Sequence, residues 1–98
     1  MGNYKDIKAF IASLVKREKP FLIIKYASVF LDRANNTYEI VTMGSGKLQY
    51  MSINRRDALD VISKYNLPLL HSLDSRNMIW GKKEFNDKYK ELCSTKTI

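Results

Sequence analysis

The sequence predicts a small single-domain α+β protein in which helices pack on an antiparallel meander sheet. The chain has 98 residues, of which 45% are hydrophobic, an ordinary value for a globular domain. Apolar residues recur at helical spacing in separate segments, and short apolar runs between turn residues indicate strands. The expected element order is α-β-β-β-α-(β-β)-α. We expect one domain over residues 1–98, with a frayed tail after about residue 93.

The first helix is indicated by an N-cap residue followed by an apolar stripe. Asn3 is a favourable N-cap, and Asp6 follows three positions later. The stripe, at positions i, i+3, i+4, i+7 and i+8, consists of Ile7, Phe10, Ile11, Leu14 and Val15. Pro20 prevents the helix from continuing.

Three consecutive strands are expected after this helix. The segment 21–31 is dense in aromatic and β-branched residues, which favours a buried strand, with a helix as the alternative for so short an apolar run. Residues 32–36 have turn chemistry and precede a second strand at 38–43. Residues 44–46 turn the chain into a third strand at 47–53. Short connections predict an antiparallel meander.

A second helix is expected from Asn54, which is again followed by an aspartate three positions later, to the boundary at Asn66 and Pro68. Its expected apolar stripe consists of Ala58, Val61, Ile62 and Tyr65, with Leu59 alongside.

The remaining elements are a short hairpin and a third helix. The hairpin is expected at 69–73 and 78–80, and the helix from about Lys82 to Leu92. Trp80 is expected to be a core residue that packs on Phe85.

Composition argues against several classes of protein. There is one cysteine, Cys93, and no Cys/His spacing suggests a zinc site. No run approaches the roughly 20 apolar residues that a membrane span needs. We therefore expect a cytoplasmic protein with no metal, no small-molecule cofactor and no membrane contact.

Two motifs invite a catalytic or nucleotide-binding interpretation. Residues 44–47, Gly-Ser-Gly-Lys, resemble part of a phosphate loop, but Val41 and Leu48 stand where that motif needs Gly and Ser/Thr, so a hairpin turn is favoured. His71 is the single histidine, with Asp74 nearby in sequence. Because no partner for nucleophilic catalysis is visible, we expect a non-enzymatic protein.

The charge of the chain indicates polyanionic or acidic partners. Net charge is +7 and the isoelectric point is near 9.6. Arg55 and Arg56 are expected in the first turn of the second helix, where free backbone N–H groups also suit phosphate. The alternatives are that Asp57 and Asp60 neutralise these arginines, and that the net charge serves solubility.

Aromatic and basic residues on the strands extend this candidate surface. If residues 51 and 53 face the core, Tyr50 points outward and could stack on an unpaired base beside Lys25 or Lys47. A structural strand tyrosine is the alternative. The expected nucleic-acid-binding residues are Arg55, Arg56, Lys25, Lys47 and Tyr50.

The element order of residues 3–66, α-β-β-β-α, is similar to that of double-stranded-RNA-binding domains. Such domains place basic residues at the start of their last helix, where Arg55 and Arg56 stand. The sequence departs from the family at 32–36, which lacks the expected glycine, proline and histidine pattern. It also lacks the alanine- and lysine-rich last helix. The resemblance is one of element order, so it implies little about function.

Two classes of function follow as hypotheses. The leading one is a non-enzymatic nucleic-acid-associated protein that binds the phosphate backbone with little sequence preference. The alternative is a small protein-binding module, an adaptor or an inhibitor encoded by a mobile element, that recognises an acidic partner surface. A small nuclease that uses His71 is a more distant third. Oligomeric state, and the choice between DNA and RNA, stay open.

Overall fold

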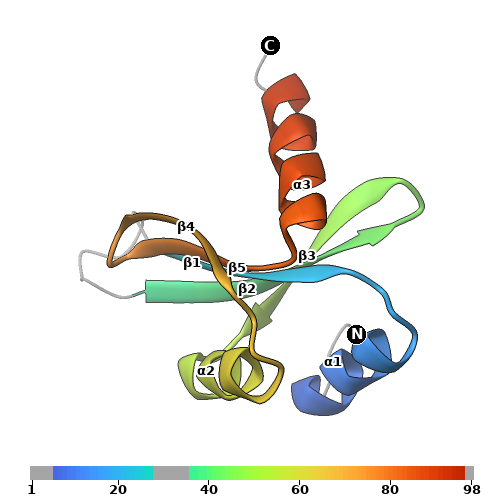
Figure 1. Ribbon diagram of the computed structural model, residues 1–98, viewed down its shortest axis with the longest axis vertical. Helices are drawn as coiled ribbons and strands as arrows, with labels where there is room; N and C mark the ends of the chain where they lie inside the picture. The colour runs from blue at the N-terminus through green and yellow to red at the C-terminus, as the bar shows by residue number, and fades with distance from the viewer. Residues whose placement is uncertain (1–5, 28–35, 97–98) are drawn as a thin grey trace.

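The computed structural model describes residues 6–27 and 36–96, which form three α-helices and a five-stranded antiparallel sheet (Figure 1). In chain order the elements are α1 (Ile7–Lys16), β1 (Phe21–Ala27), β2 (Asn36–Gly44), β3 (Lys47–Ile53), α2 (Arg55–Lys64), β4 (Leu69–Asp74), β5 (Asn77–Gly81) and α3 (Lys83–Lys96). The predicted α+β class and element order are confirmed.

The strands lie in the order β3-β2-β1-β5-β4, and every neighbouring pair is antiparallel. β1, β2 and β3 form the predicted meander. The turn between β2 and β3 consists of Ser45 and Gly46, which both have positive φ, as in type I′ hairpin turns. The β4–β5 hairpin joins the same sheet because β5 pairs with β1. The element order does not specify this last pairing.

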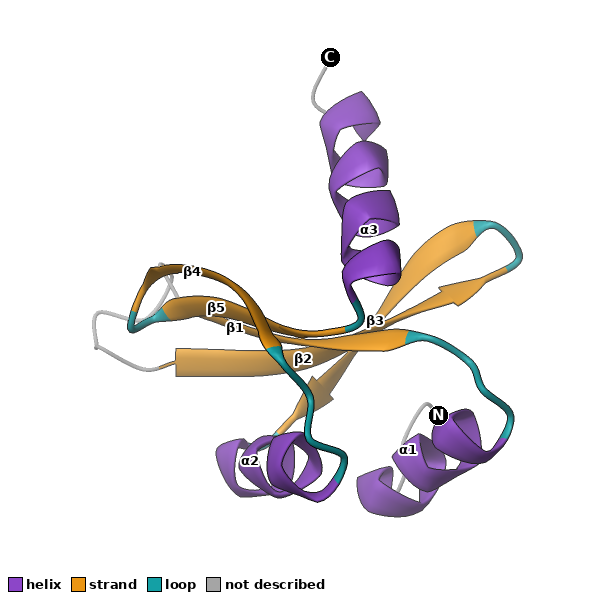
Figure 2. Ribbon diagram, viewed as in Figure 1, coloured by secondary structure: helices purple, strands orange, loops and turns teal. Residues whose placement is uncertain are grey.

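Two helices cover one face of the sheet, and the third lies on the other (Figure 2). α1 and α2 pack over Ile23 and Ile40, whereas α3 packs over Leu22 and Val41. Residues 21–24 of β1 are all buried because successive strand residues point to opposite, covered faces. This burial on both faces explains the continuous apolar run, and residues 21–27 form a strand and not a helix. The rest of the predicted segment, residues 28–31, and the predicted turn up to residue 35 lie outside the described part of the chain.

α1 has a different N-cap from the one predicted. The Asp6 side chain accepts a hydrogen bond from the backbone N–H of Ala9 (3.1 Å) and caps the helix, while Asn3 lies outside the described residues. Ile11 and Leu14 are buried, but Val15 is 39% exposed. Val15, the last residue of the predicted apolar stripe, therefore lies at the margin of the packed face, because α1 turns the Ile11–Leu14 side toward the sheet.

The predicted contact between Trp80 and Phe85 is also wrong. Trp80 pairs with Ile23 and packs on the α1/α2 face, whereas Phe85 belongs to the cluster on the α3 face. Gly81 follows Trp80 at the end of β5 and stands across from Leu22, whose side chain lies on the α3 face. The chain therefore enters α3 on the side of the sheet opposite Trp80.

Two smaller differences concern the helices. Leu59, expected alongside the α2 stripe, is 42% exposed, while Ala58 and Val61 are buried. α3 continues to Lys96, beyond the predicted end at Leu92. No helix in the described ranges is long and apolar enough to cross a membrane.

Candidate nucleic-acid interface

The N-terminus of α2 is organised by Asn54. Its side chain accepts a hydrogen bond from the backbone N–H of Asp57 (2.8 Å) and donates one to the Asp57 carboxylate (3.1 Å). The carbonyl of Asn54 accepts the first intrahelical bond, from Ala58 (2.9 Å). The backbone N–H groups of Arg55 and Arg56 are therefore among those of this turn that have no intrahelical acceptor, whereas the Asn54 side chain satisfies that of Asp57.

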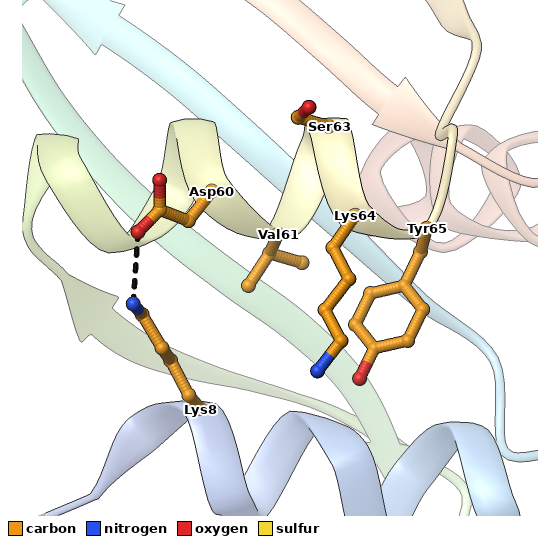
Figure 3. Close-up of a pocket in the computed structure, with 6 residues that line it drawn as sticks. All are labelled: Lys8, Asp60, Val61, Ser63, Lys64 and Tyr65. Atoms are coloured by element: carbon orange, nitrogen blue, oxygen red, sulfur yellow. Dashed lines mark hydrogen bonds and ion pairs between the residues drawn. The ribbon is translucent and has the colours of Figure 1, made fainter.

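The Arg55 and Arg56 side chains on this turn are exposed. The carboxylates of Asp57 and Asp60 beside them lie within ion-pair distance of a lysine on α1. Lys8 of α1 places its Nζ 2.8 Å from Asp60 Oδ2 and 3.7 Å from Asp57 Oδ1. Figure 3 shows Lys8 reaching from α1 to Asp60 on α2. Across residues 6–27 and 36–96, neither Arg55 nor Arg56 forms an ion pair.

The pairing of Lys8 with Asp60 shows in the pKa values of both groups. The hydrogen bond to Asp60 raises the pKa of Lys8, and the same bond lowers the pKa of Asp60, with a smaller lowering from Arg56. Both groups are solvent-exposed, so the pair contributes little to stability. Its consequence is electrostatic: Lys8 competes with Arg56 for the Asp60 carboxylate.

Lys25 lies at the same end of the sheet as this turn. It stands directly across from Tyr38 on β2, with its Nζ 5.9 Å from the ring centroid. Tyr38 in turn stands across from Ile53, the last residue of β3. The three residues form one row across the sheet, about 10 Å from β1 to β3, which leads to the start of α2. Lys25 therefore lies at the end of the sheet where α2 begins.

Lys47 and Tyr50 are not part of this region. Lys47 begins β3, and Ile53 ends it, about 20 Å away along seven residues. Tyr50 is 45% exposed, as expected, but it is on the α3 face, where it hydrogen-bonds with Cys93 and Tyr89. Burial is the largest of the effects that raise the pKa of Tyr50. Because Lys25 points to the other face, the predicted combination with Tyr50 does not form.

His71 lies exposed on the edge strand β4, and Asp74 has a structural task. The Asp74 carboxylate accepts hydrogen bonds from the backbone N–H of Arg76 (2.8 Å) and from the Asn77 amide (3.0 Å), which closes the β4–β5 turn. The bond from Arg76 is the main cause of the lowered pKa of Asp74. Within the described ranges, no three His, Cys, Asp or Glu residues are grouped as metal ligands.

Sequence reasoning missed Lys8. Its partner Asp60 is 52 residues away in sequence, so no local pattern indicates the contact. The one available signal is that Asp57 and Asp60 lie on the same side of a predicted helix, where a cation from a neighbouring element could bridge them.

No protein-family model matches the chain, and no match is found among curated proteins or solved structures.

Proposed function

We propose that this is a non-enzymatic, nucleic-acid-associated protein that binds the phosphate backbone with little sequence preference. The observation that carries the proposal is the pair of exposed arginines, Arg55 and Arg56, beside two backbone N–H groups at the start of α2. Guanidinium groups bind phosphate oxygens in bidentate fashion, and a helix N-terminus favours anions. Lys25 supplies a third positive charge at the same end of the sheet.

The position of the arginines supports a role in binding. Cations at a helix N-terminus are disfavoured by about 0.3–1 kcal/mol each. Asp57 and Asp60 offset part of this cost, since Arg56 and Asp60 attract each other, but Lys8 also pairs with both carboxylates. A phosphate bound across the first turn would relieve the unfavourable interaction while it satisfies the free backbone N–H groups.

Low sequence preference follows from the kind of contact. Contacts to phosphate fix the position of a protein on nucleic acid, but they carry no direct sequence information. The clustered residues offer charges for phosphate, and Tyr50, the candidate for base stacking, lies on the other face of the sheet.

The test is fluorescence anisotropy of labelled duplex DNA, duplex RNA and single strands over a range of salt concentrations. For duplex DNA, each phosphate contact contributes about −0.9 to the slope of log K against log salt. Three contacts predict a slope of about −2.7, and Arg55→Ala/Arg56→Ala should reduce it to about −0.9. The control is Lys83→Ala/Lys90→Ala, which removes the same charge from exposed positions on α3. It should change the slope little.

Two results would contradict the proposal. Absence of binding to any of these nucleic acids at micromolar protein and low salt would remove the function itself. Equal slopes in the arginine variant and the lysine control would place the binding elsewhere on the basic surface.

A further inference from the structure

An apolar hollow of about 200 Å³ lies where the C-terminal ends of α1 and α2 approach the start of β1 and the beginning of α3. We call it the Tyr65 hollow. Its apolar lining consists of Val15, Pro20, Phe21, Tyr65 and Leu67. Its charged lining consists of Glu18, Lys19 and Lys82.

Two neighbouring hollows adjoin the Tyr65 hollow. One, of about 340 Å³, shares Tyr65 and lies between α1 and α2, where Lys64 and Tyr65 extend side by side from α2 toward α1 (Figure 3). The other, of about 350 Å³, shares Pro20 and Lys82 and includes Lys88 of α3. The three hollows share lining residues and so lie next to one another, and we call them together the groove.

The turns that end α1 and α2 build the walls of the Tyr65 hollow. Glu18 and Asn66 have positive φ (56° and 51°). The residue after each donates its backbone N–H to the carbonyl five residues earlier, Lys19 to Leu14 (2.8 Å) and Leu67 to Ile62 (3.0 Å). This geometry is the Schellman motif. It brings Lys19 and Leu67, the residues after the two turns, to the hollow.

Among the lysines around the Tyr65 hollow, Lys82 occupies a position where a positive charge does not stabilise its helix. Its carbonyl accepts the first intrahelical bond of α3, from Asn86 (3.0 Å), so Lys82 stands at the N-cap position. Ser, Thr, Asp and Asn are preferred at N-caps, and the helix dipole disfavours a cation there. Lys19 and Lys64, by contrast, lie at helix C-termini, which the dipole favours.

The size and charge of the groove indicate its occupant. The Tyr65 hollow has a volume of about 200 Å³, which suits one large apolar side chain. Lys64 Nζ lies 5.4 Å from the Tyr65 ring centroid and covers one face of the ring. Five lysines and three carboxylates, those of Glu18, Asp60 and Glu84, line the three hollows, and the Asp60 carboxylate is paired with Lys8.

We propose that this groove binds an acidic peptide segment of a partner protein. The segment places one large apolar side chain in the Tyr65 hollow and its carboxylates against Lys19 and Lys82. The Tyr65 hollow is separate from the proposed phosphate site because Arg55 and Lys64 stand at opposite ends of α2, roughly 14 Å apart along the helix, whereas the hollow lined by Lys8 and Asp60 borders on that site.

The test uses two short fluorescein-labelled peptides rich in Asp and Glu, one with a central Phe and one with Ala at that position. The Phe peptide should bind the full chain about tenfold or more tightly than the Ala peptide because it buries an aromatic side chain. Lys19→Ala/Lys82→Ser should weaken binding of the Phe peptide by at least about threefold, while Lys83→Ala/Lys90→Ala, with the same loss of charge, should leave it unchanged. Lys82→Ser alone introduces a preferred N-cap, so its urea midpoint should not fall.

The arginine variant separates this proposal from the nucleic-acid proposal. Arg55→Ala/Arg56→Ala should keep full affinity for the Phe peptide even if it loses nucleic acid. Equal affinities for the Phe and Ala peptides, or equal losses in the groove variant and the lysine control, would overturn the inference. Loss of oligonucleotide binding in the groove variant, with no effect on the peptide, would make the groove a nucleic-acid surface instead.

Discussion

Replacing Gly81 with alanine should destabilise the protein strongly. Gly81 has φ of +151°, and a Cβ there would lie 2.6 Å from Leu22 Cδ2 and 2.9 Å from the carbonyl oxygen of Phe21. Leu22 is fully buried and the second atom is backbone, so neither can move freely. The backbone strain costs about 1–3 kcal/mol and the overpacking about 1–3 kcal/mol. The free energy of unfolding should therefore fall by about 2–6 kcal/mol, a large fraction of the total for a domain of this size.

The assay is urea unfolding followed by the fluorescence of Trp80, the single tryptophan, which precedes Gly81 in β5. Gly46→Ala is the matched control because Gly46 also has positive φ (75°) but no described atom lies within 4 Å of a Cβ built there. Its cost should be limited to about 1–2 kcal/mol of backbone strain. If the two variants unfold within about 0.5 kcal/mol of each other, the close approach of β5 to β1 is not the constraint described here.

Three further predictions concern single side chains. Asn86→Leu should raise the free energy of unfolding in urea titration by about 1–2 kcal/mol. The reason is that Asn86 is 3% exposed and its Oδ1 has no hydrogen-bond partner among the described residues. A lower free energy of unfolding in the variant would show that the amide is satisfied. Glu18→Gly should stabilise by about 0.5–1 kcal/mol, seen as a higher thermal midpoint, because φ of 56° strains a non-glycine residue; an unchanged midpoint would contradict this. Burial raises the pKa of Tyr89, so its contribution to stability is fully present below pH 10 and is lost as pH rises beyond that value. Tyr89→Phe should flatten the alkaline decline measured by urea unfolding between about pH 10 and 12, and an equally steep decline would exclude Tyr89 as its source.

Much of the fold could be predicted because local signals and tertiary structure agree. β3 occupies the predicted residues 47–53, and Asn54 caps α2 as expected. These elements are defined by turn and cap chemistry that acts within a few residues.

The remainder depends on contacts between distant residues. β5 pairs with β1, and nothing in residues 77–81 specifies that partner. The placement of Trp80 on the α1/α2 face follows from this pairing, so its contact could not be predicted from neighbouring residues.

The candidate site was predictable in the same uneven way. Arg55 and Arg56 could be located because they follow the capping residue directly. Strand alternation predicted the exposure of Tyr50 but not which face of the sheet receives α3, so its separation from Lys25 required the three-dimensional arrangement.

The most direct test of the phosphate site is NMR mapping of backbone amide shifts in the full chain during titration with a short DNA duplex at low salt. The account predicts that the largest shifts occur at residues 54–57 and at Lys25, and that these shifts vanish as salt is raised. Shifts that spread evenly over all lysines, or that centre on α3, would contradict the claim that this end of the sheet binds phosphate.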